Sequence, residues 1–370
     1  MSERAQMFGR LVVKVGASVL TDTLGKPHPQ RLEQVVEQVA ACVAQHRQMV
    51  LVSSGAIACG MAAISLKRRP SDLIQLQMCA AIGQGQLMRL YSEAFSTHGL
   101  TVAQVLLTEA DLTDRRRCDN AKHTLQALIA RRIVPIVNEN DAVAVEEIAF
   151  GDNDRLAALV ACVLDAHLLV MLSDVDGLLD NGHVIERIDT LNHTHRALAL
   201  GPSRETTMGG MASKLAAARI ARHSGIPMVI ANGTKPGILL DLLEGKPVGT
   251  MISPPQARLK FRKWWIAFAA RQPTGSIVID GGAVEAIVHR GKSLLPSGIK
   301  DVRGRFLAGE AITIVDETHH EVARGLSNFS SHELLRIRGL KSQQIADTLG
   351  PRTPHEAVHR DNLVLTQELH

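Results

Sequence analysis

The strongest constraint on the fold is an alternation of short apolar runs with longer helical patterns, extending from Arg10 to about Ile252. Strands are expected at residues 11–15, 49–53, 102–107, 133–137, 167–172 and 227–231. Helices are expected at residues 29–45, 72–97, 120–131, 153–164, 212–224 and 237–243. Alternation at this spacing predicts an α/β fold, in which helices cover both faces of a mostly parallel sheet.

The pattern changes at Ser253-Pro254-Pro255, which suggests more than one domain in the 370 residues. The following segment contains five basic residues, no acidic residue and both tryptophans, Trp264 and Trp265. It is expected to be a linker that packs between domains, and a basic, aromatic nucleic-acid contact stays open as the alternative.

From residue 274 onward the pattern consists of short apolar runs separated by glycine turns, which predicts a small β-barrel or sandwich. The expected strands are 275–280, 286–288, 299–305, 310–315 and 321–325, and the expected helices are 331–338 and 342–349. The predicted domains are therefore 8–253, a linker at 254–273, and a C-terminal domain at 274–361.

Charge and cysteine content limit the classes of function. The formal net charge is +4, and residues 274–370 hold 11 Lys+Arg against 12 Asp+Glu, so no block of cations marks a sequence-independent nucleic-acid binder. The five cysteines form no C-x-x-C pair, which suggests reduced thiols in a cytoplasmic protein. No signal peptide or apolar run of membrane-spanning length is seen.

Two lysines next to glycines suggest phosphate chemistry. Lys14 ends a predicted strand and is followed by Gly16 and Ser18, which would let main-chain N–H groups approach a phosphate. A lysine that merely extends from a strand end into solvent is the alternative.

The second lysine, Lys214, lies in the first turn of the helix predicted after Gly209-Gly210, where a cation opposes the helix dipole. That cost is reasonable if an anion is shared by the lysine, the helix N-terminus and the glycine amides. An exposed lysine at a helix start is the alternative.

Asp152, Asn153 and Asp154 directly precede a predicted helix. Asp152 is expected to cap this helix, but capping needs only one such residue. We therefore expect Asp154 to orient both lysines and Asn153 to bind substrate.

Other polar residues fall where predicted strands end, the edge at which α/β sheets bind ligands. They are Ser53-Ser54-Gly55, Asn138-Glu139-Asn140-Asp141 and Ser173-Asp174. The 138–141 group could hold the ammonium of an amino acid. The start of a helix at Ser54 would suit a substrate carboxylate, with Ser54 as a simple N-cap as the alternative.

Two motifs are rejected. Gly291-Lys292-Ser293 lacks the first glycine of a P-loop, and Gly83-Gln84-Gly85 lacks the third glycine of a dinucleotide fingerprint. The histidines and cysteines show no zinc-ligand spacing.

These motifs, in this order, resemble those of the glutamate 5-kinases of the amino-acid-kinase superfamily. The likeness rests on Val-Val-Lys-Val-Gly-Ala-Ser at 12–18, Ser-Ser-Gly-Ala-Ile at 53–57, Asn-Glu-Asn-Asp-Ala-Val-Ala at 138–144, Gly-Asp-Asn-Asp at 151–154 and Gly-Gly-Met-Ala-Ser-Lys at 209–214. It continues through 262–266 and 293–300, and the β-rich tail resembles a PUA domain. The resemblance implies a three-layer sandwich followed by a small PUA-like barrel.

The resemblance also implies an activity, the ATP-dependent phosphorylation of the L-glutamate γ-carboxylate in proline biosynthesis. The implied catalytic residues are Lys14, Lys214 and Asp154, and the implied glutamate-binding residues are Ser54, Asp141 and Asn153. The implied nucleotide-binding residues are Lys14, Ser173, Asp174, Met208, Gly209, Gly210, Met211, Ala212, Ser213 and Lys214. Thr207-Met208 stands where the family usually has Gly-Thr, and residues 179–207 are shorter than usual.

Further properties follow from the same resemblance. Mg²⁺ would be held mainly by the nucleotide phosphates, with no metal site made by protein residues alone. Proline would act as a feedback inhibitor, the chain would form a homo-dimer or homo-tetramer, and activity would be coupled to glutamyl phosphate reductase.

Two other functions stay open at this point. One is an amino-acid kinase acting on a different acidic substrate, against which the PUA-like tail argues. The other is an RNA-binding or RNA-modifying protein, which the balanced charge of the tail and its two aromatic residues, Phe306 and Phe329, argue against.

Overall fold

The chain divides into two compact units, residues 1–258 and 259–370. The computed structural model describes residues 8–22, 25–143, 152–200, 210–255, 273, 275–340, 342–350 and 354–366. Most of the predicted linker, including both tryptophans, lies outside the described residues.

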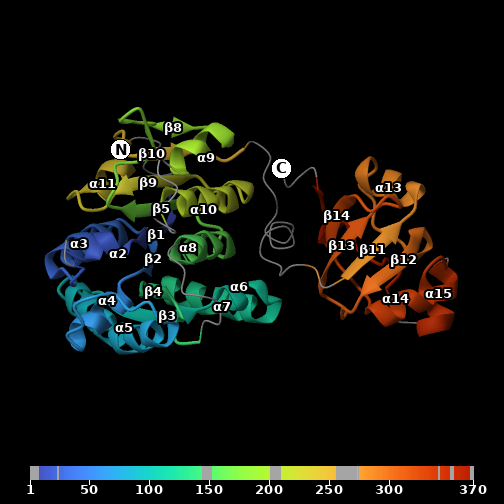
Figure 1. The fold of residues 1–370 in the computed structure, drawn as a ribbon, viewed down its shortest axis with the longest axis horizontal. Helices are drawn as coiled ribbons and strands as arrows, with labels where there is room; N and C mark the ends of the chain where they lie inside the picture. The colour runs from blue at the N-terminus through green and yellow to red at the C-terminus, as the bar shows by residue number, and fades with distance from the viewer. Residues whose placement is uncertain are drawn as a thin grey trace. The chain divides into compact units, whose positions relative to one another are not determined.

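An eight-stranded sheet forms the centre of the N-terminal unit, in the order β3-β4-β2-β1-β5-β9-β10-β8 (Figure 1). Its strands are β1 (Arg10–Val15), β2 (Gln48–Ser53), β3 (Val102–Leu107), β4 (Val134–Glu139), β5 (Leu168–Ser173), β8 (Arg187–Ile188), β9 (Met228–Asn232) and β10 (Thr250–Ile252). The first six strands in this order, β3-β4-β2-β1-β5-β9, are parallel, and β10 runs antiparallel to β9. A separate hairpin joins β6 (Leu179–Asp180) and β7 (His183–Val184).

Helices cover both faces of this sheet, as Figure 1 shows. One layer holds α2 (Ala17–Leu20), α3 (Pro29–Ala44), α4 (Ala56–Ala63), α5 (Leu73–Ser96) and α11 (Ile238–Leu243). The other holds α6 (Glu109–Thr113), α7 (Arg115–Ala130), α8 (Asp152–Val163), α9 (His193–Leu200) and α10 (Met211–His223). The predicted three-layer α/β sandwich is therefore confirmed.

The strands form because apolar, mostly β-branched runs are buried on both faces, as in β1, where Leu11, Val12, Val13 and Val15 are all fully buried. Local signals set the helix ends. The Asp72 side chain caps α5 by accepting from the Gln75 N–H, and α10 ends just before Gly225, whose φ of 73° suits glycine.

The α4 and α5 helices cross so closely that only glycine fits at the contact. A Cβ at Gly83 would lie 1.8 Å from the carbonyl oxygen of Ala56, and one at Gly60 would lie 1.8 Å from that of Cys79. This crossing fixes the start of α4, next to Ser54, relative to α5.

The C-terminal unit is built on a five-stranded sheet in the order β12-β11-β13-β14-β15. Its strands are β11 (Gly275–Ile279), β12 (Ile299–Gly304), β13 (Ala311–Val315), β14 (Glu321–Leu326) and β15 (Leu363–Leu365). Its helices are α13 (Gly281–Val288), α14 (Ser331–Ile337) and α15 (Ser342–Leu349). Among the described strand pairs of this sheet, β11–β13 is parallel and the others are antiparallel.

The strand predicted at residues 286–288 is wrong, because this apolar run is the last turn of α13. The Asp280 side chain caps that helix by accepting from the Ala283 N–H at 2.8 Å. Gly281 and Gly282 in the first turn concealed the helical pattern, since glycine is a poor helix former.

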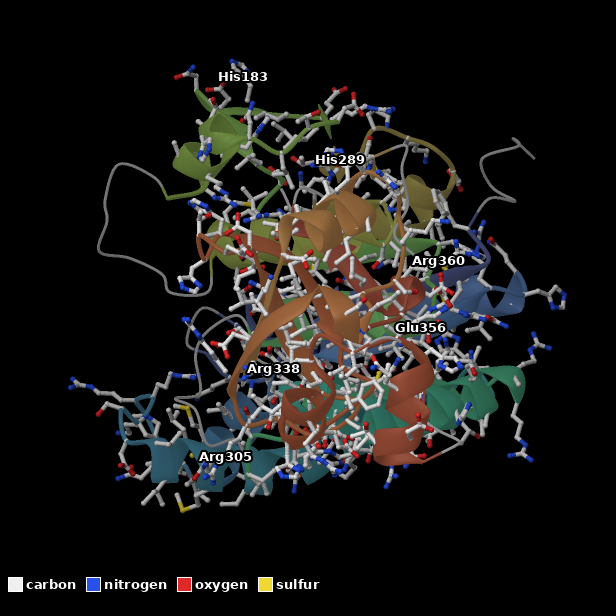
Figure 2. All side chains as sticks on the ribbon, turned by 90° about the vertical axis from the view of Figure 1, so that its right-hand side faces the viewer. His183, His289, Arg305, Arg338, Glu356 and Arg360 are labelled. Carbon is white, nitrogen blue, oxygen red and sulfur yellow. The ribbon has the colours of Figure 1, made fainter. Side chains whose placement is uncertain are left out.

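The surface of the C-terminal unit carries both basic and acidic side chains, among them His289, Arg305, Arg338, Glu356 and Arg360, which Figure 2 labels. Arg303 and Arg338 both contact Asp301, at 3.2 and 3.4 Å. Many of these cations therefore have an acidic neighbour. No helix within the described part of the whole chain is long and apolar enough to cross a membrane.

Candidate active site

Four adjacent strands bring their polar ends to one edge of the sheet. The strands β4, β2, β1 and β5 are consecutive neighbours and all run in the same direction. They carry Asn138, Ser53, Lys14 and Ser173 at or near their carboxyl ends. The sequence prediction that these polar groups share one rim is thus confirmed, and it is at this rim that α/β sheets bind ligands.

Lys14, Asp154 and Lys214 meet at this rim from β1, α8 and α10. The Nζ atom of Lys14 lies 2.6 Å from Oδ1 of Asp154, and the Nζ atom of Lys214 lies 3.3 Å from Oδ2. Asp154 is fully buried, and each lysine is 6% exposed. Neither lysine is therefore a solvent-exposed side chain at the end of its element.

Burial and pairing shift the pKa values of this group. Burial by itself would raise the pKa of Asp154, but the charges of Lys14 and Lys214 outweigh it and hold that pKa below its usual range. Burial lowers the pKa of Lys14, and the Asp154 carboxylate works against that change. One carboxylate thus faces two lysines, so the cluster is suited to receive further negative charge.

Small residues leave room around the lysines. A Cβ at Gly16 would lie 3.7 Å from the Nζ atom of Lys14, so the missing side chain keeps the space beside this cation open. The N-cap residue of α10 is Gly210, which has no side chain to accept from the first N–H groups of the helix. The Ser213 hydroxyl donates to Oδ2 of Asp154 at 2.6 Å. Ser213 was expected only as a nucleotide contact, and its bond to Asp154 was not anticipated.

Ser54 and Asn153 come together on the other side of Lys14. The Asn153 amide donates to the Ser54 hydroxyl oxygen at 3.0 Å. The N-cap of α4 is Gly55, with a φ of 109°, so the alternative that Ser54 is a simple N-cap is wrong. Asp152 is the first residue of α8, and its predicted capping bond lies outside the described contacts.

A row of side-chain amides, not predicted from sequence, extends from Asn153. Asn153 also donates to Oδ1 of Asn138 at 2.9 Å, and Asn138 donates to Oε1 of Gln84 at 2.9 Å. The Gln84 amide in turn donates to Oε1 of Gln104 at 3.3 Å. Asn138 belongs to a motif singled out in the sequence, whereas Gln84 appeared only within a rejected glycine motif.

Asp141 lies just after β4, at the start of a turn, and is itself half-buried. Burial raises the pKa of this carboxyl group to about 6, and the positive charge of Arg69 opposes the rise. Arg69, from the loop between α4 and α5, was not anticipated. Residues 144–151 lie outside the described structure.

Ser173 is the last residue of β5 and Asp174 follows it, beside Lys14 on the neighbouring strand. The Ser173 hydroxyl donates to Asp174 at 3.1 Å, and the Asp174 charge opposes the lowering of the Lys14 pKa. The other predicted nucleotide contacts that are described, Gly210 to Lys214, surround the start of α10. Met208 and Gly209 lie outside the described residues.

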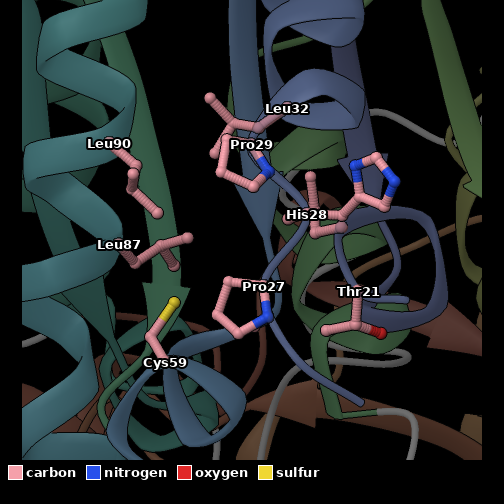
Figure 3. A pocket seen from close by; sticks show the side chains of 10 residues that line it. Thr21, Pro27, His28, Pro29, Leu32, Cys59, Leu87 and Leu90 are labelled. Carbon is pink, nitrogen blue, oxygen red and sulfur yellow. The ribbon is translucent and has the colours of Figure 1, made fainter. Parts of the chain in front are cut away.

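Apolar packing behind Gly55 supports this edge. Side chains from α2, α3, α4 and α5 converge there, including Leu20, Leu32, Cys59 and Leu87 (Figure 3). The space left between them is about 10 Å³, no more than one water molecule needs. It is a gap in the apolar packing behind the loop at Gly55, and it is too small for a substrate.

No group of three or more His, Cys, Asp or Glu suited to a metal ion occurs within the described ranges. The acidic residue at the centre of the site, Asp154, has both oxygens engaged by lysines. A divalent cation bound here would need most of its oxygen ligands from a substrate.

Two family models match this chain. The model of the amino acid kinase family matches residues 9–232, and the model of the PUA domain matches residues 275–349. Among solved structures, a UMP kinase from Bacillus anthracis superposes on 66% of this chain with a TM-score of 0.46 and 16% identity, a distant likeness.

Curated relatives match at much higher identity and over almost the whole length. The glutamate 5-kinase of Thermus thermophilus is 47% identical over 97% of this chain and 98% of its own length. The glutamate 5-kinase of Moorella thermoacetica is 45% identical over 96% of both chains. The chain therefore belongs to the amino acid kinase family and, within it, to the glutamate 5-kinase family.

Proposed function

We propose that this protein transfers the γ-phosphoryl group of ATP to the γ-carboxylate of L-glutamate, giving γ-glutamyl 5-phosphate, as the first step of proline biosynthesis. The observation that carries the proposal is the buried pair of lysines held by one carboxylate at the rim of the sheet. The near full-length likeness to curated glutamate 5-kinases supports the choice of glutamate as acceptor.

The reaction matches the chemistry of these residues. A glutamate carboxyl group has an ordinary pKa of about 4.3, so it is already a nucleophile at pH 7 and needs no general base. The protein must instead align the two substrates and stabilise the charge of the transferring phosphoryl group. Lys14 and Lys214 supply two positive charges in a site from which water is largely excluded.

Asp154 serves as the positioning group for both lysines. Its Oδ1 is paired with Lys14, and its Oδ2 is paired with Lys214 and accepts from Ser213. A carboxylate with both oxygens engaged and a lowered pKa is a poor proton acceptor, so its role is to fix the directions of the two cations.

Acceptor and donor would occupy opposite sides of Lys14. Ser54, Asn153 and Asp141 would hold glutamate, with Asp141 facing its ammonium group. Ser173, Asp174 and the segment 208–214 would contact ATP. When bound, Mg²⁺ supplies charge neutralisation on phosphate oxygens, which are ligands it prefers.

A coupled assay of ADP release tests the proposal directly. The acceptors are glutamate, N-acetylglutamate, aspartate and UMP, each at the same concentration range with ATP and Mg²⁺. Turnover is expected with glutamate above the other acceptors. Turnover with another acceptor and none with glutamate would reject the proposed substrate.

We also propose the domain limits 8–253 and 274–361, joined by a linker at 254–273. The division of the chain into two compact units and the separate family matches support these limits. A chain truncated near Gln272 should keep measurable kinase activity. Tight binding of RNA by the tail would instead favour an RNA-related role for it.

Three expectations from the resemblance stay predictions: inhibition by proline, a homo-dimer or homo-tetramer, and coupling to glutamyl phosphate reductase. A cytoplasmic location is likewise proposed, and the absence of C-x-x-C pairs among the five cysteines supports it.

A further inference from the structure

In the row of side-chain amides beside Ser54, the positions of each oxygen and NH₂ group are fixed. In a row of hydrogen-bonded side-chain amides, every oxygen could be exchanged with its NH₂ group without loss of hydrogen bonds. The orientation is fixed only if one neighbouring group can act solely as a donor or solely as an acceptor. Here that group is the main-chain N–H of Glu139, which can only donate. It lies 3.0 Å from Oδ1 of Asn138 and 3.3 Å from Oδ1 of Asn153, so both oxygens must face it.

The orientation of Asn138 then determines that of Gln84. With its oxygen turned toward Glu139, Asn138 must present its NH₂ group on the other side, where it donates to Oε1 of Gln84 at 2.9 Å. Asn138 is 2% exposed, so an amide turned the wrong way would leave a buried donor without an acceptor. The oxygen of Gln84 is therefore the acceptor that satisfies this buried NH₂ group and holds the Asn138 side chain in the orientation that Glu139 specifies.

The same argument applies to Ser54, which is predicted to bind substrate. The NH₂ group of Asn153 has two hydrogens, which are donated to Oδ1 of Asn138 and to the hydroxyl oxygen of Ser54. Because Ser54 accepts from Asn153, its own hydroxyl hydrogen is left to be donated elsewhere. A hydroxyl that must donate suits an anionic group such as a substrate carboxylate.

We propose that Gln84 is a positioning residue for the acceptor substrate. It acts from α5, without touching substrate, by accepting from the buried NH₂ group of Asn138, which keeps Asn138 and Asn153 in the orientation that makes Ser54 a hydrogen-bond donor. The inference rests on the proposed function, because it concerns the affinity for glutamate. It assigns to Gln84 a role that the catalytic lysines and Asp154 do not share.

Kinetics of Gln84 variants test this role, after turnover of glutamate by the unaltered full-length protein has been measured. Gln84→Met keeps the size of the side chain but removes the acceptor. We expect KM for glutamate to rise roughly 3- to 10-fold, the effect of one lost hydrogen bond, with kcat and KM for ATP nearly unchanged. Gln84→Glu keeps an acceptor oxygen facing Asn138 and should restore most of the affinity.

Two controls separate positioning from general damage. Gln86→Met makes the same change two residues along α5, where the exposed amide contacts Arg89, and should leave KM unaltered. In a Ser54→Ala background, Gln84→Met should have a much smaller effect, because both changes act on the same hydroxyl. Melting temperatures show whether each variant is folded, and Gln84→Ala replaces Gln84→Met if the latter does not fold.

The outcomes distinguish the two proposals. If the unaltered protein does not phosphorylate glutamate, the proposed function fails and this inference fails with it. If it does, but folded Gln84→Met keeps the original KM, or its effect is fully additive with Ser54→Ala, only the role of Gln84 is overturned. A rise in KM that Gln84→Glu reverses supports it.

Discussion

Lys14 and Asp154 form a 2.6 Å ion pair whose side chains are only 8% and 1% exposed. Lys214 approaches the other oxygen of the same carboxylate at 3.3 Å, so two buried cations share one anion. Such a cluster carries an excess of positive charge, and burial makes that excess costly until an anion binds. An excess of buried positive charge at the sheet edge suits a transferring phosphoryl group, and each of the three residues can be tested by substitution.

Loss of Lys214 should reduce catalysis far more than binding of the acceptor. For Lys214→Ala we expect kcat to fall at least about 10²-fold, as for removal of one donor to a transition state, with KM for glutamate little changed. Steady-state kinetics measures both. Lys246→Ala is the control, because Lys246 is an exposed cation that pairs with Asp241 and Glu244. An unaltered kcat in Lys214→Ala would remove this lysine from the catalytic group.

Loss of Asp154 should make folding depend on anions. Asp154→Asn leaves Lys14 and Lys214 buried without their carboxylate, and breaking a buried pair typically costs about 3–5 kcal/mol of folding free energy. We expect a lower melting temperature that rises on adding sulfate more than that of the unaltered protein does. Differential scanning fluorimetry gives both values, with Asp241→Asn as control, because Asp241 is a partly exposed carboxylate that pairs with a surface lysine. If Asp154→Asn and the unaltered protein melt at the same temperature without sulfate, the buried pairing of Asp154 with the two lysines is contradicted.

Affinity for glutamate should fall in mild acid. Burial raises the pKa of Asp141 to about 6, so this carboxylate loses its negative charge as the pH drops through that value and no longer attracts an ammonium group. The glutamate γ-carboxyl group, with an ordinary pKa of about 4.3, stays ionised there. We expect kcat/KM for glutamate to decline below about pH 6.

The variant Asp141→Asn tests the assignment of that decline. It should raise KM for glutamate at pH 7.5 and remove the decline near pH 6, because no carboxyl group is left to titrate at this position. A decline that persists unchanged in Asp141→Asn would have to come from another group.

The crossing of α4 and α5 should be intolerant of a single methyl group. In Gly83→Ala the new Cβ would lie 1.8 Å from the Ala56 carbonyl oxygen, so the helices must separate and the loop at Ser54 must shift. We expect a lower melting temperature and a raised KM for glutamate. Gly85→Ala, in the same helix, meets nothing within 4 Å and should be neutral or stabilising by up to about 1 kcal/mol. Equal stability of the two variants would argue against this close crossing.

Much of the fold could be predicted because local patterns reported it. The strand expected at 102–107 matches β3, and the helix expected at 29–45 differs from α3 by one residue at its end. Strand–helix alternation then implied parallel strands, and parallel strands place Lys14, Ser53, Asn138 and Ser173 on one edge. The grouping of the two lysines with Asp154 followed from that edge and from the glycine-rich helix start.

What local patterns missed depends on tertiary contacts. Gln84 lies within a long helix and meets Asn138 only because α5 packs beside β3 and β4, which no spacing in the sequence reports. The bond from Ser213 to Asp154 likewise joins two helices that are 59 residues apart in sequence at this contact. The helix α13 was mistaken for a strand because only its last apolar turn stood out from its two leading glycines.

Transfer of oxygen from glutamate to phosphate tests the central claim most directly. Glutamate labelled with ¹⁸O in its γ-carboxylate is incubated with the protein, ATP and Mg²⁺, and hydroxylamine traps the acyl phosphate by attack at the carbonyl carbon. If the carboxylate attacks the γ-phosphoryl group, each phosphate released carries one ¹⁸O atom, which ³¹P NMR resolves, and Lys214→Ala releases it far more slowly. Phosphate released at the full rate without ¹⁸O would mean that the glutamate carboxylate is not the acceptor.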